Sequence, residues 1–312
     1  MKDMLDSIGI KQFMRGLDLP EKGSNRRYES MQIIESFWTS IWIGADRFSH
    51  SAYLRFDKVL KEIFGWKQVP SQRTYSRFFQ KFSWKHNIDV FVPVQKWFVD
   101  TLKPENITVD FDSSVMPRYG EQEGSKVGYN PSKPGRSTHH PLMAFIAETR
   151  MVANAWLLPG NTPSLSNCKA FIDETSEILK DKKVRLIRAD SGFYAHDFLN
   201  HLEHEKKTNY IKAVKMYPAI KQEKRSKKEW VQLKDGIEIA EFEYQSPEWK
   251  HPRRMVAVRK IIEILTKATG KLLLFDEPVG RLRYSLYVTN LDLHAEQIWL
   301  SYKDRADVEN RI

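Results

Sequence analysis

A short apolar strand that carries two carboxylates most constrains what this chain can fold into. Residues 107–112 (Ile-Thr-Val-Asp-Phe-Asp) are rich in β-branched and apolar residues, which predicts a strand. Side chains two residues apart point to the same face of a strand, so Asp110 and Asp112 share a face. Burying two carboxylates is costly unless they face solvent or a metal ion. The strand is therefore predicted to lead into a polar site, where both aspartates can approach one metal ion.

The predicted elements that follow this strand indicate an α/β sheet with an antiparallel edge. A loop rich in Gly, Pro, Ser and Lys spans residues 117–140. The elements predicted after the loop are strands 141–147 and 152–158, helix 166–180, strand 184–190, a helix from about 194 to 206, and strand 210–214.

The stretch after residue 216 has a different pattern and is predicted to form a β-rich insertion outside the core sheet. It opens with a basic run, Lys221–Lys228. Strand-like segments follow at 237–244, 255–262, 272–275 and 284–289, and the last segment, 295–312, is predicted to be helical.

The first 100 residues are predicted to be helical. Apolar residues recur at helical spacing between residues 33 and 41. Ser71 is placed to cap a helix that carries Arg73 and Arg77 on one side and phenylalanines on another. Residues 1–100 are therefore predicted to be a DNA-binding region, and a merely solvated basic face is the alternative.

The charge balance favours a polyanionic partner. The 312 residues include 50 Lys and Arg against 40 Asp and Glu, a formal net charge of +10 with a pI near 9.4. Nucleic acid is the first candidate, and a basic surface kept for solubility is the alternative. The one cysteine, Cys168, excludes an internal disulfide and favours a reducing compartment. The chain carries neither a signal-peptide pattern nor a membrane span, so it is predicted to be cytoplasmic, with no membrane partner.

Two further acidic residues stand where a metal-dependent nuclease needs carboxylates. Such enzymes hold two divalent cations about 4 Å apart, and Mg²⁺ prefers carboxylate oxygens. Asp190 follows an apolar strand at the sheet end that ligand sites favour. Tyr302, Arg305 and Glu309 share one helical face. A turn aspartate and a surface ion-pair ladder explain these residues at least as well, and spacing alone does not link the three carboxylates.

In combination and in order, these segments resemble the DDE transposases of the IS4 superfamily, and within it the IS1380 family (the group-1 DDE transposase domain). The resemblance covers about residues 60–312. The matching stretches are Val109–Ser114, Tyr119–Gly124, Gly128–Arg136, His140–Leu142, Pro159–Thr162, Arg188–Tyr194 and the spacing Tyr302-x-x-Arg305-x-x-x-Glu309.

The resemblance implies an α/β fold with an RNase H-like catalytic core. It assigns the catalytic, metal-binding triad to Asp112, Asp190 and Glu309, with Mg²⁺ as cofactor and Mn²⁺ able to substitute. Asp112 is preferred over Asp110 because two serines follow it, while a shared role for Asp110 stays open. The implied domains are a helical N-terminal domain (1–100), the first part of the core (101–216), the β-rich insertion (217–282), and the end of the core with the catalytic helix (283–312).

The resemblance further implies a bacterial DNA transposase, nucleoid-associated when it is bound to DNA. Its activity would be metal-dependent strand cleavage at transposon inverted-repeat ends, followed by strand transfer. Its partners would be double-stranded DNA with such ends and a second copy of the chain, as a homodimer in the DNA complex. His139 and His140 either contact phosphate or have a structural role. The expected DNA-binding residues are Tyr302, Arg305, Lys133, Arg136, Arg73 and Arg77.

The family signature continues, after Glu309, with six residues and a lysine, which falls beyond Ile312. The chain is therefore expected to be a C-terminally truncated copy. The alternative function is that of a catalytically inactive DNA-binding transposase remnant. An RNase H-like nuclease that does not transpose is disfavoured, because a minimal nuclease does not need the insertion before Glu309.

Overall fold

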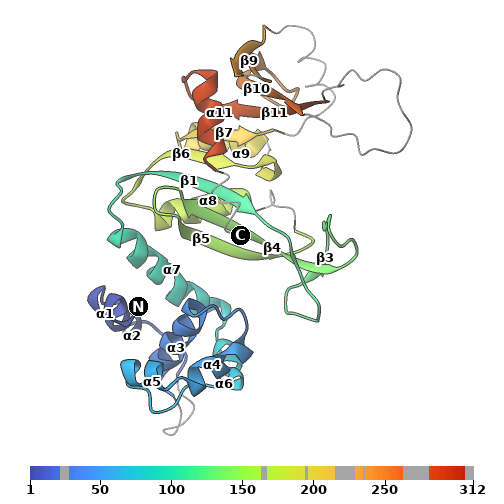
Figure 1. Cartoon of the computed structure of the whole chain (residues 1–312). Coiled ribbons are helices and arrows are strands. Elements are labelled where there is room, and N and C mark those ends of the chain that lie inside the picture. The colour runs from blue at the N-terminus through green and yellow to red at the C-terminus, as the bar shows by residue number, and fades with distance from the viewer. Residues whose placement is uncertain are drawn as a thin grey trace. The chain divides into compact units, whose positions relative to one another are not determined.

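The computed structural model describes residues 1–21, 28–162, 167–193, 196–214, 229–234, 236–262 and 281–305 (Figure 1). The chain divides into two compact units, Met1–Thr101 and Leu102–Ile312. Within the described ranges, no helix is long and apolar enough to cross a membrane.

The described part of the first unit is helical. Gly65 ends the fifth helix with a φ of 68°, in the left-handed conformation that favours glycine at this position. The helices are α1 (Lys2–Ser7), α2 (Ile10–Arg15), α3 (Ser30–Trp42), the 3-10 turn η1 (Phe48–His50), α4 (Ser51–Phe56), α5 (Lys58–Phe64), α6 (Gln72–Phe79) and α7 (Trp84–Thr101).

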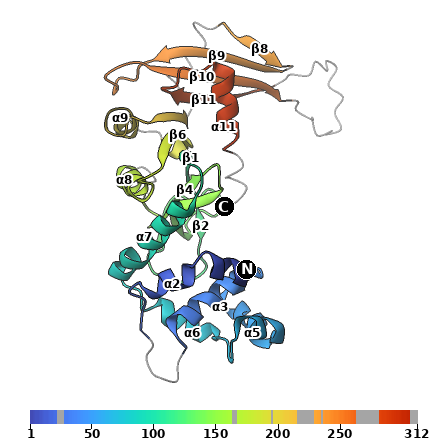
Figure 2. The same cartoon turned by 90° about the vertical axis from the view of Figure 1, so that its left-hand side faces the viewer.

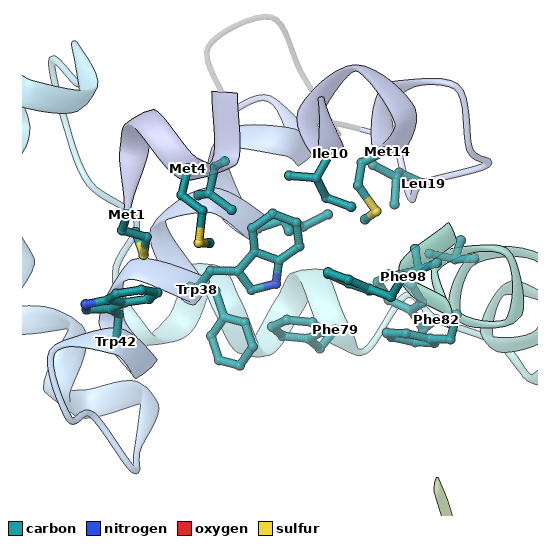
Figure 3. Close-up of a pocket in the computed structure, with 16 residues that line it drawn as sticks. Met1, Met4, Ile10, Met14, Leu19, Trp38, Trp42, Phe79, Phe82 and Phe98 are labelled. Carbon is teal, nitrogen blue, oxygen red and sulfur yellow. The ribbon is translucent and has the colours of Figure 1, made fainter. Parts of the chain in front are cut away.

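Aliphatic, aromatic and methionine side chains form the core of this unit. Tyr75 of α6 is fully buried, and its hydroxyl donates to the Oγ atom of Ser36 in α3 at 2.9 Å. An apolar cavity of about 330 Å³ lies within the same core. Figure 3 shows Met4 and Met14 on one side of this cavity and Phe79 on the other. The lining of the cavity carries no charged side chain, so burial of apolar surface holds these helices together.

The second unit contains an 11-stranded mixed sheet, in the order β2-β4-β1-β6-β7-β11-β10-β9-β8, with β3 and β5 also paired to β4. Strand β1 is antiparallel to β4 and parallel to β6, and β6 is parallel to β7. The predicted α/β sheet with an antiparallel edge is therefore confirmed. The strands are β1 (Asn106–Ser113), β2 (Met116–Pro117), β3 (Lys126–Val127), β4 (Ser137–Ile146), β5 (Met151–Pro159), β6 (Lys183–Ala189), β7 (Asn209–Ala213), β8 (Val231–Lys234), β9 (Ile237–Tyr244), β10 (Arg253–Ile262) and β11 (Arg281–Thr289).

Helices cover both faces of this sheet. They are α8 (Cys168–Ile178), α9 (His196–Asn200), which continues as a π-helix over His201–Glu205, and α11 (Ala295–Lys303). Figure 2 shows α8 and α9 on one side of the central strands and α11 on the other. Phe111 of β1 contacts Phe171 of α8 on the first side. On the second side, Ile211 of β7 packs with Ile298 and Trp299 of α11.

The strands of the predicted insertion correct one expectation. They do not form a lobe outside the core sheet but extend that sheet, because β11 pairs with β7 along one edge and with β10 along the other. Strands β9 and β8 then continue from β10. The basic run Lys221–Lys228 and the predicted strand 272–275 lie outside the described residues.

The predicted loop 117–140 is also shorter than expected. Strand β4 begins at Ser137, and its first residues pair with the short strands β2 and β3. His139 pairs with Met116, and Thr138 pairs with both Pro117 and Lys126. The polar residues that suggested a loop here therefore belong to the start of a strand, which pairs with two short strands and, from His139 onward, with β5.

A buried ion pair joins the central strands to α11. Arg188 of β6 and Asp110 of β1 are register partners, and both side chains are buried. The guanidinium donates to both carboxylate oxygens of Asp110, at 2.6 Å from Nε and 2.7 Å from Nη2. Its Nη1 atom donates to the carbonyl oxygen of Ser301 near the end of α11, at 2.5 Å. One arginine therefore links two strands and the helix that covers them.

Removal of this arginine should destabilise the second unit strongly. We expect Arg188→Ala to lower the free energy of unfolding by about 3–5 kcal/mol, because it leaves the Asp110 charge buried without its partner. Urea denaturation followed by circular dichroism measures the change. The matched control is Arg185→Ala in the same strand: its exposed side chain donates to Asn106, and its loss should cost less than about 0.5 kcal/mol. Equal effects of the two substitutions would contradict the assignment.

Candidate functional site

Two carboxylates follow the last paired residues of the parallel strands β1 and β6. These parallel strands pair Asp110 with Arg188 and Phe111 with Ala189. One further step along both strands brings Asp112 beside Asp190, the residue that follows β6. Asp112 shares the face of Asp110, since side chains at every second residue of a strand point the same way, and Asp190 lies just beyond the end of β6. The placement agrees with the rule that ligand sites of α/β sheets lie at the carboxyl ends of parallel strands.

The electrostatic setting of Asp112 indicates a site that is short of positive charge. Asp112 is 8% exposed. Burial raises the pKa of Asp112 above its ordinary value, the guanidinium of Arg305 opposes this rise, and the negative charge of Asp190 adds to it. Carboxylate oxygens are the ligands that Mg²⁺ prefers, so this pair fits a divalent cation.

The structure distinguishes Asp110 from Asp112, which the strand pattern left equivalent. Both oxygens of Asp110 accept hydrogen bonds from Arg188, and the side chain has no exposed surface. Asp112 lies nearer the strand end. Its Oδ1 atom accepts from Arg305 at 2.6 Å. A cation can therefore reach Asp112 more readily than Asp110.

Arg305 reaches this site from the segment that follows α11. The side chain is 1% exposed, and Nη2 also donates to the carbonyl oxygen of Phe111 at 3.0 Å. Tyr302, one turn earlier, packs its ring 4.6 Å from that of Tyr287. Tyr302 and Arg305 therefore both have partners within the protein. Their expected contact with DNA phosphate stays a prediction. Glu309 lies outside the described residues.

Two buried ionisable side chains, Lys212 and Cys168, are close enough to Asp190 to feel its charge. Lys212 of β7 is fully buried, with its Nζ atom 4.1 Å from the centroid of the Phe198 ring. Burial holds the pKa of Lys212 well below its ordinary value, although the charges of Cys168 and Asp190 oppose the shift. Burial also raises the pKa of the Cys168 thiol to about 12. The sequence did not single out Lys212; a lysine in an apolar strand is the signal that could have found it.

Two histidines, for which the sequence left two roles open, hold the loop before β4. His139 accepts from Nε of Arg118 at 2.8 Å, and its Nε2 atom lies 2.9 Å from the carbonyl oxygen of Glu123. The Nε2 atom of His140 lies 3.0 Å from the carbonyl oxygen of Tyr129. Both rings are buried, so the described contacts give them a structural role.

The loop held by these histidines presents Lys133 and Arg136 at the surface. Both cations lie over the ring of Tyr119, with Lys133 Nζ at 4.7 Å and Arg136 Cζ at 4.5 Å from its centroid. The ammonium of Lys133 also donates to the Tyr119 hydroxyl and lowers the pKa of that phenol. The sequence did not reveal Tyr119 as a partner of the two cations, because the contact depends on how the loop folds.

The first unit has a polar hollow of about 770 Å³ between α4 and α6. Its charged residues are Arg73 and Arg77, which the sequence singled out, and Arg55, which it missed. All three are exposed. Among the residues that the structure describes, none of the three has a carboxylate partner. The lining residues are Ser49, Ser51, Ala52, Arg55, Ser71, Gln72, Arg73, Ser76, Arg77 and Gln80.

Ser71 occupies the N-cap position of α6, as predicted, but it does not cap the helix. Its hydroxyl lies 3.2 Å from the Oγ1 atom of Thr74, and no side-chain bond to the helix amides is present. The hydroxyl therefore belongs to the polar lining of the hollow.

A different cluster has the spacing of a metal site but a competing partner. Ligand atoms of Glu203, His204 and His251 lie within 4.8 Å of one another. Both oxygens of Glu203 already accept from Arg253, at 2.8 and 2.7 Å. A metal ion would have to compete with that guanidinium, as it would with Arg305 at Asp112.

Comparison with known proteins matches the whole chain to one family. The family described as Transposase DDE domain group 1 matches residues 1–312. No curated protein matches the sequence.

Several solved transposase structures are similar to the chain. The piggyBac transposase synaptic complex with hairpin DNA is 15% identical, with a TM-score of 0.47 over 96% of this chain and 60% of that one. The Drosophila P element transposase strand transfer complex is 10% identical, with a TM-score of 0.30 over 61% and 39% of the two chains. A pre-cleavage Mos1 transpososome is 16% identical, with a TM-score of 0.21 over 62% and 63%. The chain thus spans less than two thirds of the length of each.

The thiol of Cys168 should be protected in the folded protein. With a pKa of about 12, it is almost entirely neutral at pH 8, whereas an exposed cysteine is substantially ionised. We expect Ellman's reagent to modify the folded chain on the order of 1,000-fold more slowly than the urea-unfolded chain. Cys168→Ser is the control and should give no signal in either state. Rapid modification in native buffer would show that this region is open.

Proposed function

Because this chain belongs to the transposase DDE domain group 1 family, we propose that it is a DNA transposase that cuts DNA strands with divalent cations. The observation that supports the proposal is the parallel register of β1 and β6, which ends at Phe111 and Ala189, so that Asp112 and Asp190 are the next residue on each segment. The proposed reaction is strand cleavage at inverted-repeat ends followed by strand transfer. Membership of the IS4 superfamily and the IS1380 family is part of the same proposal.

The strands around this pair support an RNase H-like core. Strands β1, β4 and β5 form an antiparallel meander, and β6 and β7 add to the other side of β1 in parallel. The meander is followed by α8, and α9 lies between the two parallel strands. The first strand is thus central and carries the first carboxylate of the proposed triad.

We propose Asp112, Asp190 and Glu309 as the catalytic, metal-binding triad. Bound Mg²⁺, or Mn²⁺ in its place, supplies Lewis-acid stabilisation of the charge that develops during phosphodiester cleavage. Asp112 and Asp190 offer carboxylate oxygens from the ends of two rigid strands. Arg305 positions the Asp112 carboxylate through the 2.6 Å hydrogen bond. Asp110 has the separate task of holding Arg188.

The proposed DNA partner is a duplex with inverted-repeat ends, bound by a homodimer in the bacterial cytoplasm, at the nucleoid. We propose that the exposed cations of the two units and the residues of the Tyr302-x-x-Arg305 spacing contact the phosphates of this DNA. Arginine forms bidentate contacts with phosphate, and lysine acts as a point charge. The proposed residues are Arg73, Arg77, Lys133, Arg136 and Tyr302, together with Arg305, which is buried against Asp112 and would contact only a phosphate that enters the carboxylate site.

A DNA-binding protein without catalysis is the second candidate, and the hollow beside Arg73 favours it. This hollow collects three arginines without any contribution from the carboxylate pair. Binding and cleavage can therefore be separated by experiment: the second candidate predicts duplex binding without cation-dependent nicking.

Substitution of the carboxylate pair should abolish cation-dependent cleavage. We expect Asp190→Asn and Asp112→Asn each to weaken Mn²⁺ binding and to slow nicking of supercoiled plasmid by about 100-fold or more. Loss of even an outer-shell partner of a metal ligand commonly costs 10–100-fold. Isothermal titration with MnCl₂ and gel assays of nicking measure the two effects.

The matched control for this test is Asp181→Asn, an exposed aspartate that precedes β6. It should leave Mn²⁺ binding and nicking unchanged. Asp110→Asn should instead lower the free energy of unfolding, since it removes the charge that faces Arg188. Cleavage that survives Asp190→Asn would refute the catalytic assignment.

The hollow of the first unit should account for part of the salt-dependent DNA affinity. We expect Arg55→Ala, Arg73→Ala and Arg77→Ala each to reduce the slope of log K against log[salt] by about one, as the loss of one phosphate contact does. Fluorescence anisotropy with a labelled duplex measures the slope. Arg15→Ala, at an exposed arginine of α2 outside the hollow, is the control and should not change it. Equal slopes for all four variants would exclude the hollow as a DNA contact.

A further inference from the structure

The loop between β2 and β4 is fastened at several points. His139 and His140 contact the carbonyl oxygens of Glu123 and Tyr129, as described above. Gly128 packs so closely on Gly160 that an added Cβ atom would lie 1.9 Å from the Gly160 carbonyl oxygen. A loop that needs close backbone contact and two buried histidines is built to hold a fixed shape.

The surface that this loop presents is an aromatic ring with two cations. Arg136 lies over the ring of Tyr119, and Lys133 bonds to its hydroxyl. Even with both cations in place, Tyr119 is 69% exposed. An aromatic ring that is exposed to this extent contributes little buried surface to the stability of the fold. Cation–π contacts at exposed sites contribute weakly to stability.

The register of β4 places this surface near the carboxylate pair. Met143 of β4 is the partner of Asp112, and His139 is the partner of Met116, two residues before Arg118 and three before Tyr119. Arg118, which precedes Tyr119, donates to the carbonyl oxygen of Ser137, and six residues of strand separate Ser137 from Met143, a distance of about 20 Å. A DNA strand bound at the carboxylates thus has Tyr119 within the reach of a few nucleotides.

We propose that Tyr119, Lys133 and Arg136 form a stacking site for an unpaired nucleotide of the DNA strand next to the candidate active site. The inference rests on the proposed function, which it deepens by naming the form of DNA that this part of the site binds. Every base offers a π-face to an aromatic side chain, and cations beside the ring bind the flanking phosphates. A fully paired duplex keeps its bases stacked on one another and would use the two cations alone.

Single-stranded and duplex DNA distinguish these two modes. The full chain, without divalent cations, is titrated with a labelled oligonucleotide about 20 nucleotides long, single-stranded or annealed to its complement. We expect Tyr119→Ala to weaken binding of the single strand about tenfold and binding of the duplex less than threefold. Tyr119→Phe, which keeps the ring and loses the hydroxyl, should bind the single strand within about twofold of the unsubstituted chain.

A second measurement reports stacking directly. An adenine in the single strand is replaced by 2-aminopurine, whose fluorescence is quenched when the base stacks. The unsubstituted chain and Tyr119→Phe should quench it, and Tyr119→Ala should not. Tyr129→Ala is the matched control, since Tyr129 is an equally exposed tyrosine of the same loop, at 74% exposure, whose ring has no cation over it in the described residues. An unchanged melting temperature shows that each variant is folded.

Several results would overturn the inference. These are a single-strand affinity unaffected by Tyr119→Ala, an equal loss for single strand and duplex, a loss from Tyr119→Phe as large as that from Tyr119→Ala, or an equal loss from Tyr129→Ala. Failure of the unsubstituted chain to bind the single strand would overturn it as well. None of these outcomes bears on cleavage, because no cation is present. The proposed function fails separately, through the Asp190→Asn experiment.

Discussion

Two aspartates of strand β1, each paired with an arginine from another segment, hold the candidate site together. Arg188 binds Asp110 and the carbonyl oxygen of Ser301, and Arg305 binds Asp112 and the carbonyl oxygen of Phe111. The second pair joins residues 193 positions apart in the sequence. Every other feature of the site depends on these contacts, because they fix the end of β1 against β6 and against the segment that follows α11.

The two aspartates differ in how fully an arginine compensates their negative charge. Asp110 faces a guanidinium that binds both of its oxygens, whereas burial and the charge of Asp190 raise the pKa of Asp112 despite Arg305. A carboxyl whose pKa is higher in the folded chain than in the unfolded chain lowers stability as the pH rises through that pKa. Ionised Asp112 is therefore a cost to the folded protein, and a bound cation would offset it. The same strand supplies one structural aspartate and one that is available for a ligand.

The sequence predicted the parts of this fold that depend on local pattern. Alternation gave the strand around Asp110, the strand that ends before Asp190 and the antiparallel edge. Pattern could not predict that β10 joins the same sheet, because that depends on β11 pairing with strands on both of its edges, a contact between distant segments. The partners of His139 were equally out of reach, since they depend on how a long loop folds back. The role of Arg188 follows from register, which no single strand reveals.

The cations of the chain divide into two groups by what they contact. Arg188 and Arg305 are buried and neutralise carboxylates of the protein, so they hold the site and contribute little to the field outside it. Arg73 and its neighbours in the hollow, and the pair Lys133 and Arg136, are exposed and, in the described part of the chain, have no carboxylate partner. A net charge of +10 alone could not distinguish a solubility effect from a DNA surface. The exposed cations are gathered in a hollow and around one open ring, whereas charges kept only for solubility have no reason to converge. This convergence favours a polyanion as the partner.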